Sequence, residues 1–193
     1  MNEMEKKVQS IGVVPVIKLN HPERDAIPLA KALIAGGVPV AEVTFRAAGA
    51  AIAIKAMREN FPEMLVGAGT VLTIAQVDEA MAAGAQFIVT PGMDPEIVAY
   101  CQKVGIQIFP GCTTPTDYHT AYKFGLEVLK FFPAEQSGGI NLKNLADYVK
   151  NPVIAACGGS YMVTADLIDN GKWDEITALC KQSVEIVKEA RNG

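Results

Sequence analysis

The 193-residue chain is long enough for one domain with a sizeable core, because half of its residues are apolar and only a fifth are charged. Its net charge of −4 and its scattered Lys and Arg residues exclude the basic surface that a nucleic acid partner would need. We therefore predict a single domain spanning residues 1–193.

The four cysteines are far apart in the sequence. Cys101, Cys112, Cys157 and Cys180 form no C-x-x-C pair, and only two histidines could join them as metal ligands. We expect no metal and interpret them as small core residues in a reducing compartment, with a disulfide framework as the weaker alternative. The first ten residues are polar and no apolar run is long enough to span a bilayer, so we expect a cytoplasmic protein without a membrane partner.

Strands and helices are predicted to alternate along the chain. The predicted strands are Val13–Leu19, Val38–Phe45, Leu65–Val71, Gln86–Thr90, Gln107–Phe109, a segment around Lys130, and Val153–Cys157. The predicted helices are Asp25–Ala35, Ala48–Asn60, Ile74–Ala83, Asp94–Val104, Thr116–Phe124, Asn141–Lys150 and Trp173–Arg191. This alternation predicts an α/β protein with parallel strands buried on both faces.

Two α/β architectures fit such a pattern. An open nucleotide-binding sheet would need G-x-G-x-x-G after its first strand, but that strand runs into Lys18-Leu19-Asn20-His21. The short repeating unit favours a barrel, in which the loops after the strands carry the chemistry.

One lysine, Lys130, stands alone in an apolar segment between Gly125 and Pro133. Desolvation lowers the pKa of a lysine toward neutrality, and a neutral amine attacks ketones. Lys130 is therefore a candidate Schiff-base lysine. The alternative is a lysine that reaches water or pairs with a carboxylate.

Polar side chains also follow the second and third predicted strands. Glu42, Thr44 and Arg46 alternate, so they share one face, and Glu42 could serve as general acid and base near Lys130. Arg46 suits a substrate carboxylate, and Thr70 beside Gly69 offers a hydroxyl. The alternatives are an ordinary Glu–Arg salt bridge and a threonine placed for strand propensity.

The segment Gly158-Gly159-Ser160 follows the last predicted strand and precedes a helical turn. Its backbone N–H groups and its hydroxyl could hold a phosphate, or the segment could be a simple tight turn.

Taken together, the ordered motifs resemble those of the 2-keto-3-deoxy-6-phosphogluconate (KDPG) and 4-hydroxy-2-oxoglutarate (KHG) aldolases. The motifs are Glu42-Val43-Thr44-x-Arg46, Gly67-Ala68-Gly69-Thr70, Thr90-Pro91-Gly92, Phe109-Pro110-Gly111, Lys130-Phe131-Phe132-Pro133-Ala134-Glu135 and Gly158-Gly159-Ser160. The resemblance implies a class I aldolase of Entner–Doudoroff metabolism, a TIM barrel and a homotrimer, with no cofactor.

The resemblance also implies roles for individual residues. Lys130 would form the imine and Glu42 would shuttle protons, while Arg46 and Thr70 hold the substrate carboxylate. Further residues would contact substrate, namely Pro91 and Phe132 at the pyruvoyl group and Gly158, Gly159 and Ser160 at the phosphate.

One part of the family pattern is absent. Between Glu135 and Val153 the chain has a single Gly138-Gly139 pair and one predicted helix, where the family has another helix and a seventh strand. We therefore predict an α/β, TIM (β/α)8-type barrel without one βα unit near the seventh strand. The residues could be missing from the sequence, removed by engineering or lost naturally.

Two other readings remain open from the sequence. A phosphate-binding barrel isomerase or epimerase could use the Gly-Gly-Ser turn, and a damaged barrel could persist as a binding or assembly subunit. The isomerase or epimerase would not need the isolated lysine.

Overall fold

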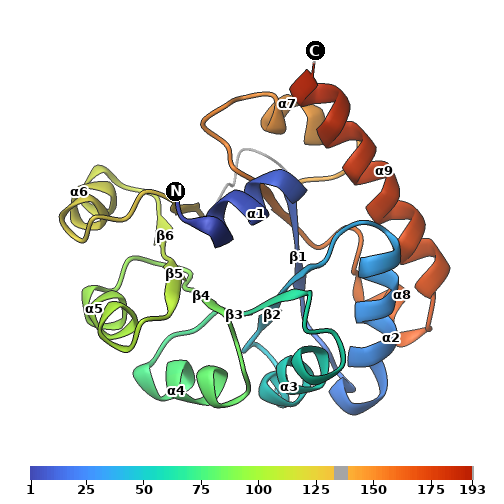
Figure 1. Cartoon of the computed structure of the whole chain (residues 1–193), viewed down its shortest axis with the longest axis horizontal. Helices are drawn as coiled ribbons and strands as arrows, with labels where there is room; N and C mark the ends of the chain where they lie inside the picture. The colour runs from blue at the N-terminus through green and yellow to red at the C-terminus, as the bar shows by residue number, and fades with distance from the viewer. Residues whose placement is uncertain (133–138, 193) are drawn as a thin grey trace.

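The computed structural model describes residues 1–132 and 139–192. Helices lie around the outside of a curled sheet of parallel strands (Figure 1). The helices are α1 Glu3–Ile11, α2 Pro22–Ala35, α3 Ala50–Asn60, α4 Ile74–Ala82, α5 Pro95–Val104, α6 Pro115–Lys123, α7 Leu145–Val149, α8 Ala165–Asp169 and α9 Trp173–Asn192. The strands are β1 Val13–Ile17, β2 Val40–Thr44, β3 Leu65–Gly69, β4 Phe87–Val89, β5 Gln107–Phe109, β6 Gly111–Cys112, β7 Lys130–Phe131 and β8 Cys157–Gly159. The prediction of an α/β protein with parallel strands is confirmed.

Six strands form one sheet in the order β5-β4-β3-β2-β1-β8, and β6 and β7 form a second, parallel pair. Pro110 separates β5 from β6, and a proline cannot donate a ladder hydrogen bond. The six-stranded sheet ends at β5 and β8, and within the described residues β7 and β8 do not pair with each other.

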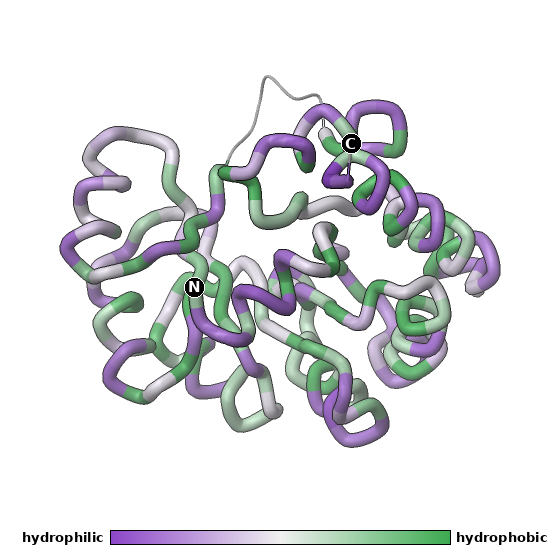
Figure 2. The backbone as a smooth tube through the Cα atoms, turned by 45° about the horizontal axis from the view of Figure 1, so that its top comes forward, coloured by the Kyte–Doolittle hydropathy of each residue, from purple (hydrophilic) through white to green (hydrophobic). Residues whose placement is uncertain are grey.

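The core lies between the strands and the inner faces of the helices. Every residue of β2 and β3 is buried, which fits the continuous apolar character of parallel strands covered on both sides. The helices alternate between polar and apolar residues around each turn (Figure 2). Their apolar faces therefore cover the sheet while their polar faces meet solvent.

Local signals define the ends of several helices. Asp94 caps α5, Pro95 takes its first turn, and Gly105 ends it in the left-handed conformation, with φ 77°. Thr114 and Asp117 form a reciprocal capping box at the start of α6. These caps fix where the loops after β4 and β6 end.

Helix α1 was not predicted, because the first ten residues are polar. Asn2 and Glu5 form a capping box, and Gly12 ends the helix with φ 78°. The Gln107 side chain at the start of β5 accepts a hydrogen bond from Asn2 at 2.6 Å and donates one to Glu5 at 3.2 Å. Helix α1 therefore covers the amino end of the sheet, opposite the loops that follow the strands (Figure 1).

The last predicted strand is wrong in its position. Residues 153–156 are not strand, and Val153 is 88% exposed, whereas Gly158 and Gly159 belong to β8. The Arg191 guanidinium donates hydrogen bonds to carbonyl groups of Gln9, Val149, Ile154 and Ala155. These bonds fix the irregular segment before β8 against the ends of α1, α7 and α9.

The remaining element boundaries differ from the predicted ones by a few residues. Helix α2 begins at Pro22 rather than Asp25, and α7 is shorter than the predicted Asn141–Lys150 helix. Residues 133–138, which contain the Pro-Ala-Glu part of the motif and Gly138, lie outside the described residues. No helix among the described residues has the length and apolar character needed to cross a membrane.

Candidate active site

Lys130 and Glu42 form an ion pair inside the curled sheet. Lys130 begins β7 and Glu42 lies in the middle of β2, and the Lys130 Nζ donates to Glu42 Oε1 at 3.2 Å. The lysine side chain is 23% exposed and the glutamate side chain only 5%. A carboxylate held against an amine in this way can give and take protons during imine chemistry. The structure thus brings together the two residues predicted as catalytic.

Phe132 lies on another side of the same amine. The Lys130 Nζ is 5.1 Å from the centroid of the Phe132 ring, within the range of a cation–π contact. The amine therefore lies between a carboxylate and an aromatic ring. Both groups can stabilise the positive charge of a protonated imine formed at that nitrogen.

Pro91 packs closely against Gly111, the residue that pairs with Lys130. Gly111 of β6 pairs in register with Lys130, and its N–H donates to the Thr90 carbonyl at 3.0 Å. A Cβ at Gly111 would lie only 2.2 Å from the Pro91 carbonyl oxygen. The absence of a side chain at Gly111 therefore lets the Pro91 loop reach the strand beside the amine.

Thr70 has a strained backbone. It follows β3 with φ 56° and is the only non-glycine residue with positive φ among the residues that the structure describes. A β-branched residue pays a steric cost in this conformation, and such strain concentrates at functional sites. The prediction for Thr70 named its hydroxyl, and the structure adds the unusual backbone.

A cavity of about 340 Å³ opens near the ends of β1, β2 and β8. Its lining includes Arg46 and Ser160, two of the predicted substrate-binding residues, together with Lys18, Asn20 and Thr164. Two basic side chains and several hydroxyl or amide groups suit an anionic ligand. Thr44 also lines the cavity, but its hydroxyl donates to the Ile17 carbonyl at 2.8 Å and ties β2 to β1.

Lys18 was not predicted as a site residue. It directly follows β1 at the carboxyl end of the sheet, as Arg46 follows β2. Reading the end of the first strand by the rule applied to the other strands would have found it.

Gly158 and Gly159 are placed differently from the predicted turn. They pair with Val14 and Pro15 of β1, and the cavity begins only at Ser160. A Cβ on Gly159 would lie 3.0 Å from the Tyr161 ring. The two glycines thus bring β8 and its following loop to the edge of the cavity.

The cysteines are all buried and free. Burial raises the pKa of Cys157 and of Cys101 to about 11. Their thiols are therefore protonated and unreactive at neutral pH. Among residues 1–132 and 139–192, no cluster of three or more His, Cys, Asp or Glu side chains could hold a metal ion.

A family model described as KDPG and KHG aldolase matches residues 4–146 and, in a second segment, residues 136–179. A 2-dehydro-3-deoxy-phosphogluconate aldolase of Treponema pallidum is 45% identical over 201 aligned positions, which cover 93% of this chain and 95% of that protein. The KHG/KDPG aldolase of Escherichia coli K12 is 38% identical, with coverage of 91% and 92%.

Solved structures agree with these relatives. The KDPG aldolase of Legionella pneumophila, with pyruvate captured as a covalent carbinolamine, superposes with a TM-score of 0.86 at 36% identity and covers 92% of this chain and 96% of its own. The KDPG aldolase of Zymomonas mobilis with 3-phosphoglycerate gives 0.86 at 34% identity, with coverage of 94% and 95%.

Proposed function

Since the chain belongs to the KDPG and KHG aldolase family, we infer that Lys130 is the amine with which it forms a Schiff base. The protein is an aldolase, a lyase that cleaves KDPG reversibly to pyruvate and glyceraldehyde 3-phosphate. The substrate range that we propose extends to KHG, which yields pyruvate and glyoxylate. The observation that carries the assignment of Lys130 is its 3.2 Å contact with the buried Glu42.

The reaction begins when the neutral Lys130 amine attacks the C2 ketone. Glu42 transfers protons so that the carbinolamine loses water and becomes a protonated imine. Glu42 then takes the proton of the C4 hydroxyl, and the C3–C4 bond breaks to release the aldehyde. The bond electrons move into the imine and leave an enamine. Protonation at C3 and hydrolysis release pyruvate and regenerate Lys130.

The proposed substrate contacts divide between the amine and the cavity. Arg46 and Thr70 hold the carboxylate, while Pro91 and Phe132 flank the pyruvoyl group. At the far end, Ser160 and the loop that begins at Gly158 and Gly159 take the phosphate. Lys18 lines the cavity with Ser160, which supports Lys18 as a cation for that phosphate.

We propose that the curled sheet is a TIM-type barrel without one βα unit. The two matches to the family model overlap at residues 136–146. This overlap supports one short segment here in the place of two separate segments in the family. The 201 positions aligned with the Treponema protein include 93% of 193 residues, about 180, so about 21 positions have no residue here. That number suits one βα unit.

The proposed assembly is a homotrimer, and the proposed location is the cytoplasm. The trimer rests on resemblance to the family. The four free cysteines support a reducing compartment.

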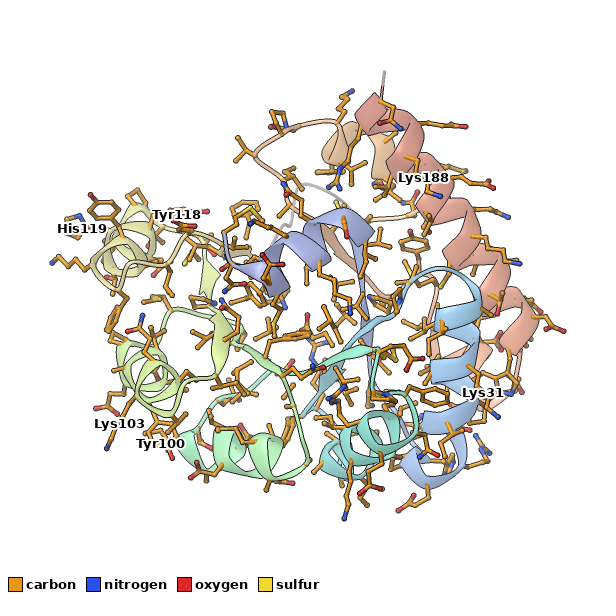
Figure 3. The ribbon with its side chains drawn as sticks, viewed as in Figure 1. Lys31, Tyr100, Lys103, Tyr118, His119 and Lys188 are labelled. Atoms are coloured by element: carbon orange, nitrogen blue, oxygen red, sulfur yellow. The ribbon has the colours of Figure 1, made fainter. Side chains whose placement is uncertain are left out.

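The test is to incubate the protein with pyruvate and borohydride and to map the adduct by peptide mass spectrometry. We expect the reduced pyruvate adduct on Lys130, with no adduct and no KDPG cleavage in Lys130→Ala. Lys103→Ala is the matched control, because Lys103 points outward from α5 (Figure 3), and it should behave as wild type. An adduct on another lysine, or none in the wild type, would overturn the proposal.

A further inference from the structure

Gly69 lies directly against the side chain of Glu42. It is the last residue of β3 and pairs in register with Thr44, while Gly67 pairs with Glu42 itself. A Cβ on Gly69 would lie 2.4 Å from Glu42 Oε1, 2.6 Å from its Cγ and 2.9 Å from its Cδ. The Glu42 side chain therefore occupies the space that any other residue at position 69 would fill.

That space decides where the carboxylate lies. The same oxygen, Oε1, that touches Gly69 accepts the hydrogen bond from Lys130 at 3.2 Å. The Glu42 side chain is only 5% exposed, so buried neighbours surround it and restrict its movement. We propose that Gly69 is a positioning residue. Because it has no side chain, it leaves the space in which the Glu42 carboxylate lies against the Lys130 amine. The inference rests on the proposed function of these two residues.

A comparison within β3 separates positioning from packing. A Cβ on Gly67 would lie 2.2 Å from the ring of Phe87, a core residue that is 2% exposed. A methyl group at Gly67 must therefore push a buried ring, whereas a methyl group at Gly69 pushes the flexible end of a glutamate. Neither glycine has positive φ, so alanine fits the backbone at both positions.

The first experiment uses Gly69→Ala and two assays. One is KDPG cleavage, and the other is exchange of the pyruvate methyl protons with deuterated water, followed by proton NMR. Exchange reports proton transfer between imine and enamine. Because a displacement of about 1 Å can cost about 10²-fold in rate, both rates should fall by about that factor. The KM for KDPG and the thermal midpoint should change little.

The second experiment is a double-mutant cycle with Glu42→Gln. Once the carboxylate is gone, Gly69→Ala should lower the exchange rate no further, because it acts through that carboxylate. A general structural effect would instead multiply the two losses. Gly67→Ala should lower the thermal midpoint, yet its folded fraction should exchange pyruvate protons as the wild type does.

The outcomes are distinguishable. If the wild type forms no pyruvate adduct, the proposed function itself is wrong. If the wild type exchanges protons and Gly69→Ala does so at the same rate, the proposed function stands and the positioning role is wrong. Loss of folding in Gly69→Ala, seen by circular dichroism, would also overturn the inference, because the methyl group would then disturb more than Glu42.

Discussion

Replacing Thr70 by glycine should improve stability and weaken keto-acid binding in the same protein. The left-handed conformation, with φ 56°, costs an L-residue about 1–2 kcal/mol. Glycine removes that cost but adds about 0.5–1 kcal/mol of chain entropy to the unfolded state. The Thr70 side chain is only partly buried, so its removal costs little packing. We therefore expect a net gain of about 0.5–1 kcal/mol, or about 1–4 °C in thermal midpoint.

The functional effect of Thr70→Gly should have the opposite sign. A hydrogen bond to a charged group contributes about 1.5–3 kcal/mol, so its loss should weaken pyruvate binding by about 10- to 150-fold. Calorimetry gives the thermal midpoint, and the pyruvate dependence of borohydride trapping gives the affinity. Thr70→Ser is the control, since it keeps the hydroxyl and should keep the affinity. A lower midpoint in Thr70→Gly, or an unchanged affinity, would refute the reasoning.

Three further predictions concern the charges and the buried thiols. Glu42→Gln should still trap pyruvate on prolonged incubation but lose about 10²–10⁴-fold in KDPG turnover, and normal turnover would exclude Glu42 as the proton carrier. Lys18→Ala should raise the KM for KDPG about tenfold, the lower end for a charged hydrogen bond, because Lys18 is exposed. The KM for KHG, which has no phosphate, should change little, and equal effects on both substrates would contradict a phosphate contact. Burial raises the pKa of Cys157 to about 11 and that of Cys180 to about 12. The two buried, protonated thiols make their full contribution to folding stability below pH 9. This contribution is lost as the pH rises toward 11, because the unfolded chain then releases protons that the folded chain retains. Urea titrations should show that decline in the wild type and a smaller one in Cys157→Ala, while equal declines would contradict the assignment.

The sequence predicted the alternation of strands and helices because each element has its own apolar period and its own terminal residues. It missed α1, although the capping pair Asn2 and Glu5 was readable. The helix is polar along much of its length and gains its place from contacts with Gln107, more than a hundred residues away. Such long-range contacts have no signature in the local pattern.

Lys130 and Glu42, the proposed catalytic pair, could be picked out in the sequence because both lie on strands, where barrel chemistry is found. The contact between Lys130 and Glu42 joins β7 to β2 across the curled sheet. The role of Gly69 was out of reach, because it depends on which side chain lies over a glycine. The position of β8 was wrong because Val153 to Ala156 has the apolar character of a strand but is held as irregular chain by Arg191.

The separation of β7 from β8 affects how the site responds to thermal motion. Lys130 lies on β7 in the two-stranded pair, and Ser160 follows β8 at one end of the six-stranded sheet. With no hydrogen-bond ladder between these two strands in the described part of the chain, the distance from the Lys130 amine to Ser160, the proposed phosphate contact, depends on how stiffly the other strands hold them. Warming that softens the sheet should therefore impair cleavage of the long, phosphorylated substrate before it impairs proton exchange in pyruvate, which occupies one end alone. The selectivity of this aldolase would then vary with temperature while its chemistry stayed the same.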